Sequence, residues 1–133
     1  MDFTRLEAMV RNCPFHRMLG LELDAFDADT GVVTIGLPLR LEFSRLEDSV
    51  QLHGGVTAAL IDIAGDYAVA ARVGHVVPTI DLRIDYLKMG YGTRISATAR
   101  ALRLGRSIGT VDVDVHDEGG TLIAVGRGKY ATA

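Results

Sequence analysis

The sequence predicts an α+β fold in which one long central helix is wrapped by a curved antiparallel sheet of about six strands. Residues 56–72 are almost all apolar and contain no proline, which is typical of a helix buried on nearly every side. The segments before and after it alternate apolar and polar residues, as strands with one buried face do. The apolar surface of a helix without a wide polar stripe must be shielded from water, and a curved sheet that wraps the helix does this most simply.

Two short helices and a hairpin are expected before the long helix. The first segment places its apolar residues at helical spacing, and Gly20 closes a second helical turn. The turn sequence Asp27-Ala28-Asp29-Thr30-Gly31 joins two alternating segments, which is typical of a β-hairpin. The expected elements are helices over 2–12 and 14–19, strands over 21–27 and 31–37, and a loop over 39–52.

Further strands are expected after Pro78. Glycine-containing turns separate them, and short connections favour antiparallel pairing between successive strands, so we predict a four-stranded meander. These strands are expected over 81–86, 95–101, 111–116 and 121–131. All 133 residues are expected to form a single domain, because this length allows one hydrophobic core.

The composition excludes several classes of function. The net charge is −3 and no segment concentrates Lys or Arg, so a nucleic-acid partner is not expected. No apolar run reaches the roughly 20 residues that span a bilayer, so no membrane partner is expected. The N-terminus lacks the features of a signal peptide, which predicts a cytoplasmic location. The single cysteine, Cys13, suggests neither a disulfide nor a metal site, and no metal or cofactor is expected.

Asp62 and Asp66 are the acidic residues of the long apolar helix. They lie four residues apart and therefore on one face of the helix. Burying a carboxylate without a partner is costly, so an acidic residue in such a helix is a candidate for a functional site. The alternative is that this face meets solvent or an arginine such as Arg72.

The residues before the helix favour the functional interpretation. His53-Gly54-Gly55 directly precedes it, and glycine lets a ligand approach the backbone because it has no Cβ. The unpaired N–H groups of the first turn point toward such a ligand, with the positive end of the helix dipole behind them. A polarised carbonyl oxygen suits this environment, which is then an oxyanion hole.

The length of the helix separates these two features. Gly54 and Asp62 are eight residues apart, or about 12 Å along a helix, so one carbonyl group cannot touch both. Two helices that run antiparallel about a two-fold axis would bring the glycines of one chain to Asp62 of the other. The spacing therefore predicts a homodimer with two composite sites.

The segment His53-Gly54-Gly55-Val56-Thr57-Ala58-Ala59-Leu60-Ile61-Asp62 resembles the PaaI-like (phenylacetic acid degradation type) hotdog thioesterases. That family shows HGG, four residues, a Leu, one residue and then the catalytic acid. Further segments are similar to the same family, over 79–87, 104–107 and 123–128. The resemblance covers most of the chain and implies the hotdog fold, an acyl-CoA substrate, and a homodimer that assembles as a dimer of dimers.

The resemblance also implies roles for individual residues. Asp62 would act as general base on water or as nucleophile on the thioester carbon. Gly55, together with Gly54, would donate a backbone N–H to the carbonyl oxygen, and His53 would brace the start of the helix. Thr79 stands where relatives often carry a Ser or Thr that helps to hold the attacking water.

One position departs from the family pattern. Many relatives have an Asn six residues before the His, and this sequence has Glu47 there. Either the Asn contact is missing, or Glu47 takes another role as an acid within the site. Asp66 is a further candidate for the catalytic acid if Asp62 is structural.

Other residues are candidates to bind the two ends of acyl-CoA. Arg103, Arg106 and Lys88 are the candidate partners of the CoA phosphates, with plain solvated charge as the alternative for each. The acyl group is expected to enter an apolar tunnel between helix and sheet. Tyr67 and Phe43 are candidates to line that tunnel, although a core or rim position is the more common role for such residues.

Two other functions are alternatives to hydrolysis. Hydratases and dehydratases of enoyl-CoA share this fold, but the hydratase signature Asp-x-Asn-x-x-His is absent from the sequence. A catalytically silent acyl-CoA-binding protein is the non-enzymatic alternative. Release of free thiol from acyl-CoA distinguishes the enzyme from the binder.

Overall fold

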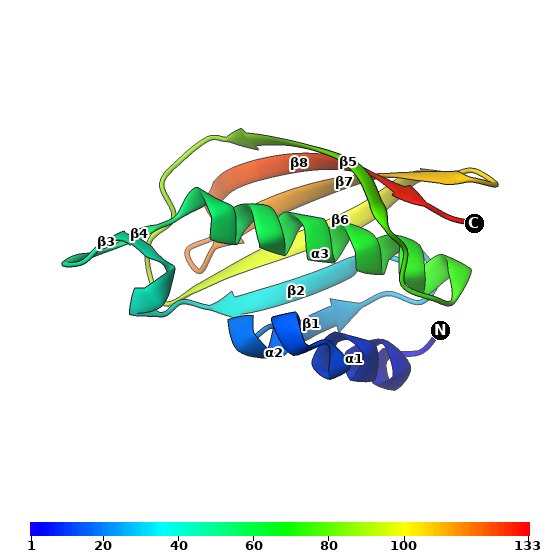
Figure 1. Ribbon diagram of the computed structural model, residues 1–133, viewed down its shortest axis with the longest axis horizontal. Coiled ribbons are helices and arrows are strands. Elements are labelled where there is room, and N and C mark those ends of the chain that lie inside the picture. Colours follow the sequence, from blue (N-terminus) through cyan, green and yellow to red (C-terminus); the bar gives the residue numbers. More distant parts are fainter.

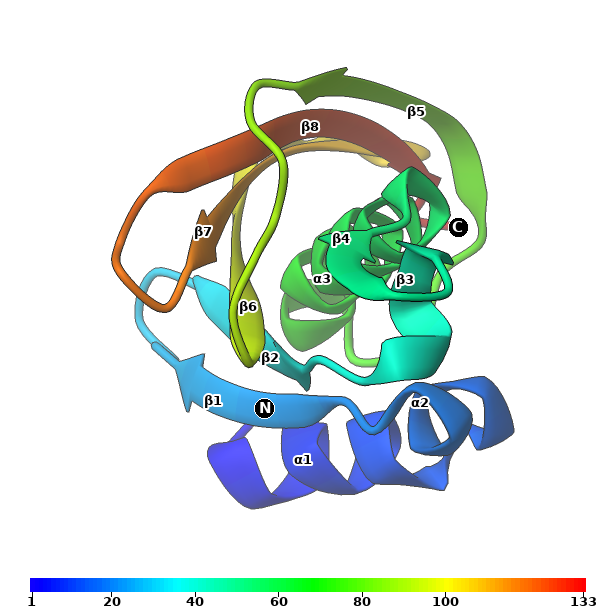
Figure 2. The ribbon, with the colours of Figure 1, turned by 90° about the vertical axis from the view of Figure 1, so that its left-hand side faces the viewer.

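The computed structural model shows a long helix lying in the concave face of one curved sheet (Figure 1, Figure 2). It describes residues 1–133, except for the side chain of Val50. The helices are α1 (Phe3–Asn12), α2 (Pro14–Leu19) and α3 (Gly54–Val73). The strands of the curved sheet are β1 (Glu22–Phe26), β2 (Val33–Pro38), β5 (Thr79–Tyr86), β6 (Arg94–Leu104), β7 (Ile108–Asp117) and β8 (Leu122–Ala131). This arrangement confirms the predicted class of fold.

The strand order corrects one expectation. The six strands follow the order β1-β2-β6-β7-β8-β5, so β6, β7 and β8 form the predicted meander, but β5 pairs with β8 and not with β6. The connection 87–93 crosses the end of the sheet to reach β6 (Figure 2). Alternation indicates which face of a strand is buried and not which strand lies beside it. One edge of β5 is consequently unpaired within the described chain.

The expected loop over 39–52 is instead a helical turn followed by a small hairpin. The turn is η1 (Leu41–Phe43), and the hairpin pairs β3 (Ser44–Leu46) with β4 (Ser49–Leu52). Strands of three and four residues are too short to show an alternating period. The N–H of His53 donates to the carbonyl of Phe43 at 2.8 Å, so the segment is anchored to the start of α3.

α3 begins two residues earlier than the sequence predicts. His53 is extended and acts as the N-cap, so Gly54 and Gly55 form part of the first turn. The helix ends where Gly74 adopts the left-handed conformation, with φ of 91°. The side that faces the sheet is fully buried, as at Leu60, Ala64, Ala68 and Val69. The face that carries Asp62 is only partly buried.

The N-terminal helices cover the other end of the sheet from β5. α1 lies along β1, and α2 follows it toward α3 (Figure 2). α1 buries Leu6 and Val10, and α2 buries His16 and Leu19. No helix of the described residues is long and apolar enough to cross a membrane.

α3 approaches β8 closely because glycines make room for the ring of Tyr130. A Cβ on Gly65 or on Gly128 would overlap that ring. Tyr130 is fully buried, and its hydroxyl donates to the main-chain carbonyl of Asp62 at 3.1 Å. This contact fixes the depth of the helix at the level of Asp62.

We predict that Gly65→Ala lowers the free energy of unfolding by about 1–3 kcal/mol, because the new methyl group overlaps the Tyr130 ring. Without the overlap, replacing glycine by alanine in a helix interior would raise the free energy of unfolding by up to about 1 kcal/mol. Urea unfolding at a fixed protein concentration measures the change. Gly119→Ala, in an exposed turn with ordinary clearance, is the matched control. A stabilised Gly65→Ala variant would contradict this packing.

Candidate functional site

The first turn of α3 is capped by the side chain of His53. Its Nδ1 accepts a hydrogen bond from the N–H of Gly55 at 2.9 Å. A Cβ on Gly55 would lie 3.0 Å from that nitrogen, so glycine allows the ring to sit this close. The N–H of Gly55 is therefore occupied by the cap rather than open to a ligand.

The ring of Tyr86 occupies the space beside Gly54. A Cβ on Gly54 would lie 3.3 Å from this ring, and the Tyr86 hydroxyl donates to the carbonyl of Gly54 at 2.8 Å. The two glycines thus admit side chains of the protein itself, which the sequence analysis did not anticipate. The N–H of Gly54 is different, because no hydrogen bond to it is found among the described residues. It is the open donor of this turn.

A cavity of about 350 Å³ lies beside this donor. Gly54 and Thr57 line it from α3, and Tyr86 lines it from β5. Two basic side chains, Arg45 and Lys88, stand in the same lining. The cavity therefore combines the start of a helix with two cations, which suits an anionic ligand.

The carboxyl group of Asp62 is held from the sheet. The hydroxyl of Thr79 donates to its Oδ1 at 2.7 Å, and Tyr130 donates to its main-chain carbonyl. Thr79 and Tyr130 are direct cross-strand partners in the pairing of β5 with β8. One residue pair of the sheet therefore positions both the backbone and the side chain of Asp62.

Asp66 lies one turn beyond Asp62, and its Oδ1 accepts a hydrogen bond from the N–H of Val77 at 3.1 Å. Burial raises the pKa of Asp66 to about 6; the Val77 hydrogen bond opposes this shift, and the charge of Asp62 adds to it. The alternative that Arg72 pairs with this face is wrong. Arg72 instead donates to the carbonyl of Asp29 at 3.2 Å.

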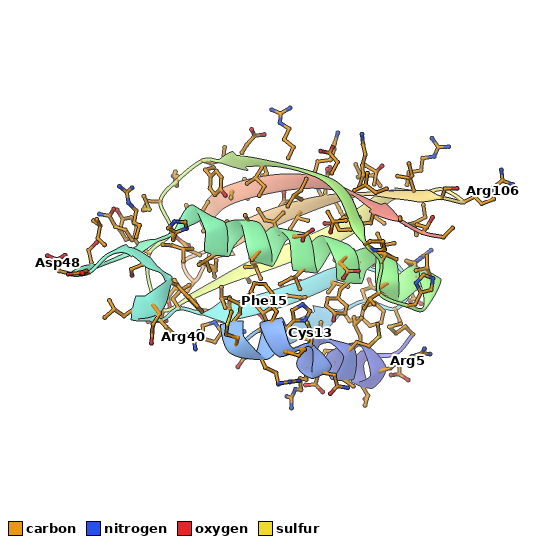
Figure 3. The ribbon with its side chains drawn as sticks, in the orientation of Figure 1. Arg5, Cys13, Phe15, Arg40, Asp48 and Arg106 are labelled. Carbon is orange, nitrogen blue, oxygen red and sulfur yellow. The ribbon has the colours of Figure 1, made fainter. Side chains whose placement is uncertain are left out.

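Glu47 is not brought near Asp62 within one chain. It lies in the exposed turn of the β3–β4 hairpin, next to Asp48, which projects at one end of the molecule (Figure 3). Gly54 and Asp62 are also apart, because the continuous helix between them separates them by about 12 Å. The residues therefore fall into two groups, one at the start of α3 and one around Asp62.

The predicted phosphate-binding residues are divided in the same way. Lys88 lines the cavity beside Gly54. Arg106 marks the opposite end of the molecule (Figure 3), where it lines a different cavity together with Arg103 and Lys129. Within one chain, Lys88 does not form one cluster with the two arginines.

Sequence reasoning missed Tyr86, Tyr130 and Arg45. Tyr86 lies on β5 and Tyr130 on β8, and the pairing of these two strands could not be inferred. Arg45 lay in a segment interpreted as a loop. A usable signal was the glycine at every second position of 126–128 before Tyr130, since small residues on one face of a strand allow a helix to approach.

We predict that Asp66→Asn raises the free energy of unfolding by about 2 kcal/mol at pH 8 and does not raise it at pH 4. The folded state raises the pKa of Asp66 above that of the unfolded chain, so stability falls as the pH rises from about 4 to about 6. Asn keeps an acceptor for Val77. Urea unfolding at both pH values measures the effect, with exposed Asp29→Asn as control. Equal stability of Asp66→Asn and wild type at both pH values would contradict the prediction.

Comparisons with known proteins agree with this architecture. Residues 51–124, more than half of the chain, match the thioesterase superfamily. The medium/long-chain acyl-CoA thioesterase YigI of Salmonella typhimurium is 31% identical, over 93% of this chain and 88% of the relative. The acyl-coenzyme A thioesterase PaaI of Escherichia coli is 28% identical, over 92% of this chain and 84% of the relative.

A solved structure of a protein from the thioesterase superfamily has a TM-score of 0.90 to this chain. The two sequences are 33% identical, and the match covers 96% of each chain. The helix in a curved six-stranded sheet is the hotdog architecture that the HGG motif indicates. The chain therefore belongs to the thioesterase superfamily, as a PaaI-like member with the hotdog fold.

Proposed function

We propose that this chain hydrolyses an acyl-CoA thioester to a free acid and CoA. The observation that carries the proposal is the carboxyl group of Asp62, which the hydroxyl of Thr79 holds on the partly buried face of a largely apolar helix. The family and the names of its relatives support the class of reaction. The proposed setting is a cytoplasmic homodimer that assembles further as a dimer of dimers.

The proposed site combines residues of two chains. The open donor at Gly54 and the carboxylate of Asp62 are too far apart on one helix to hold one thioester. The face of α3 between them carries small residues at Gly55, Ala58 and Ala59, which lets a second helix approach closely. A two-fold axis with antiparallel α3 helices then brings Gly54 of one subunit to Asp62 of the other.

The free edge of β5 supports the same arrangement. β5 ends the sheet, and its backbone hydrogen-bonding groups are available to another strand. Ile80 and Tyr86 on this strand are large apolar side chains and are 54% and 55% exposed. Pairing of β5 with the same strand of a second chain would cover them and continue the sheet.

In the proposed reaction, Asp62 acts as the general base. Its second oxygen, which has no protein partner among the described residues, accepts a proton from water while the water oxygen attacks the thioester carbon. The carbonyl oxygen becomes an oxyanion and is stabilised by the N–H of Gly54 of the partner subunit. Collapse of this intermediate breaks the C–S bond, and the proton on Asp62 passes to the sulfur of CoA.

Direct attack by the Asp62 carboxylate is the alternative route. It expels the CoA thiolate and forms an anhydride, which water then hydrolyses. Both routes need Thr79 to fix the orientation of the carboxyl group and an N–H donor for the carbonyl oxygen. Because His53 occupies the N–H of Gly55, we assign the donor role first to Gly54. Glu47 precedes the same helix start and would belong to the half-site of Gly54.

We propose that CoA approaches through the cavity beside Gly54. Lys88 and Arg45 stand there as partners for its phosphates. Arg103 and Arg106 stay predicted contacts that would reach a CoA molecule only in the assembled protein, because they line a cavity at the other end of the chain.

Asp62→Asn is expected to lower kcat by about 10²–10⁴-fold, because an amide cannot accept the proton from water. Release of free thiol from a panel of aliphatic and aromatic acyl-CoAs measures the loss, with Asp29→Asn in the exposed β1–β2 turn as control. If the wild type released no thiol from any acyl-CoA, the protein would be an acyl-CoA-binding protein and not a hydrolase. If thiol release were lost in Asp66→Ala but not in Asp62→Ala, the catalytic acid would be Asp66, one helical turn beyond Asp62.

Gly54→Pro removes the proposed oxyanion donor with little change to the backbone. Proline is well tolerated at the first helical position, and His53 already has the extended conformation (φ −67°, ψ 131°) that a residue before proline adopts. We expect kcat to fall by about 10²–10³-fold, whereas Gly54→Ala keeps the N–H and serves as the matched control.

Mixing the two inactive variants tests the composite site. In a heterodimer of Asp62→Asn and Gly54→Pro, one of the two sites keeps both groups, so random exchange restores about one quarter of wild-type activity. Thiol release after subunit exchange measures this recovery. A mixture no more active than its components would place the whole site within one chain and contradict the dimer proposal.

A further inference from the structure

Another cavity, of about 450 Å³, lies beside the later turns of α3. Cys13, labelled in Figure 3, lies on the side of the N-terminal helices that faces α3 and contributes to the lining. Met9 lines the cavity from α1, Tyr67 lines it from α3, and Val77 lines it from the segment before β5. The volume is in the range of pockets that hold small organic ligands.

Two lining residues of this cavity are close to Asp62 and Thr79 along the chain. Pro78 belongs to its lining and directly precedes Thr79, whose hydroxyl donates to Asp62. Asp66 also belongs to the lining and stands one helical turn, or about 6 Å, beyond Asp62. A chain attached to a carbonyl carbon at Asp62 therefore meets this cavity after about one turn of the helix.

The middle of α3 leaves no comparable space against the sheet. Leu60, Ala64 and Ala68 on that side of the helix are fully buried against the sheet. Phe43 is buried as well, and its ring lies under the guanidinium of Arg40 rather than along a tunnel. Along the middle of α3 the core therefore fills the space where a tunnel between helix and sheet was expected. The space that does lie between helix and sheet is the cavity at the start of α3, which is assigned to CoA.

We propose that the cavity between the N-terminal helices and α3 receives the acyl group, and that its occupant is an unbranched alkyl chain. The inference rests on the proposed thioesterase function, and it adds the class of acyl group and the elements that select it. The proposal depends on the position of the cavity, whose lining residues Asp66 and Pro78 stand close to Asp62 and Thr79 along the chain, and not on the cavity volume alone.

The chemistry of the lining suits a hydrocarbon. Met9 is unbranched and flexible, and a thioether adapts to chains of different length. His16 is held by the carbonyl of Val10 at 3.1 Å, and burial lowers its pKa, so its neutral form is favoured. Asp66 is the carboxyl group of the lining; burial raises its pKa to about 6, which makes its neutral form accessible when the cavity fills.

The binding affinity that this cavity contributes is expected to grow with the length of the acyl chain. Each methylene buried in an apolar pocket improves binding about fourfold. The relative from Salmonella typhimurium is named for medium- and long-chain acyl-CoA, which agrees with a long apolar pocket. An acetyl group would end before the cavity begins and would gain nothing from it.

Filling the cavity tests the proposal. Cys13→Phe places a ring in the lining, while Asn12→Phe adds the same ring at the exposed neighbouring position. We expect Cys13→Phe to lower the ratio of kcat/KM for lauroyl-CoA to kcat/KM for acetyl-CoA at least about tenfold, with no change of this ratio in Asn12→Phe. An unchanged ratio of lauroyl-CoA to acetyl-CoA in a folded Cys13→Phe variant would overturn the proposal.

Alkylation of Cys13 tests the same cavity in the unmodified protein. Cys13 is the single cysteine of the chain, so iodoacetamide labelling reports on this position alone. The non-hydrolysable thioether dodecyl-CoA should slow the labelling in proportion to its occupancy, and ethyl-CoA at equal occupancy should not. Equal labelling rates with both would overturn the acyl pocket.

The two tests separate this inference from the proposed reaction. Thiol release that is normal in wild type, together with equal labelling rates, would keep the thioesterase and remove the pocket. Protection by dodecyl-CoA in a protein that releases no thiol would keep the pocket and remove the reaction.

Discussion

Two hydroxyl groups, one from the edge strand β5 and one from its neighbour β8, hold the part of α3 that carries Asp62. Thr79 donates to its side chain, and Tyr130 donates to its main-chain carbonyl. The two donors face each other across the pairing of β5 with β8, so the position of the acid depends on that register. Any slip of β5 by one residue would turn Thr79 away from the helix.

The length of α3 then determines what the rest of the molecule must provide. A buried helix supplies a rigid frame, and a rigid frame keeps its first turn about 12 Å from Asp62. Catalysis needs the reacting groups held near van der Waals contact, so a single helix cannot present both of these to one thioester. The unpaired edge of β5 and the small residues on the open face of α3 are the features that a second subunit would use.

Most of the fold could be predicted from periodicity and turns. The long apolar helix, the two short helices and the β1–β2 hairpin follow from local patterns that tertiary contacts do not override. The pairing of β5 with β8 could not be predicted, because alternation does not identify neighbours. The β3–β4 hairpin was missed because its strands are too short to show a period.

The residues of the candidate site that belong to a sequence motif could be predicted. The contacts that distant residues make with them in the folded chain could not. His53, Gly54 and Asp62 stand in one stretch of sequence, and the resemblance supplied Thr79. The occupation of the Gly55 N–H by His53 depends on a side-chain conformation that spacing does not specify. Tyr130 reaches Asp62 from 68 residues away, which only the folded sheet makes evident.

A crystal structure with an acyl-CoA analogue that carries a ketone in place of the thioester would show whether Gly54 and Asp62 of two subunits form one site. We expect a carbonyl oxygen about 2.7–3.1 Å from the backbone nitrogen of Gly54 of one subunit. We also expect the carbonyl carbon to lie about 3–3.5 Å from a water oxygen or a carboxylate oxygen at Asp62 of the other subunit. A ligand whose carbonyl contacts groups of one chain only, or lies away from Asp62, would contradict it.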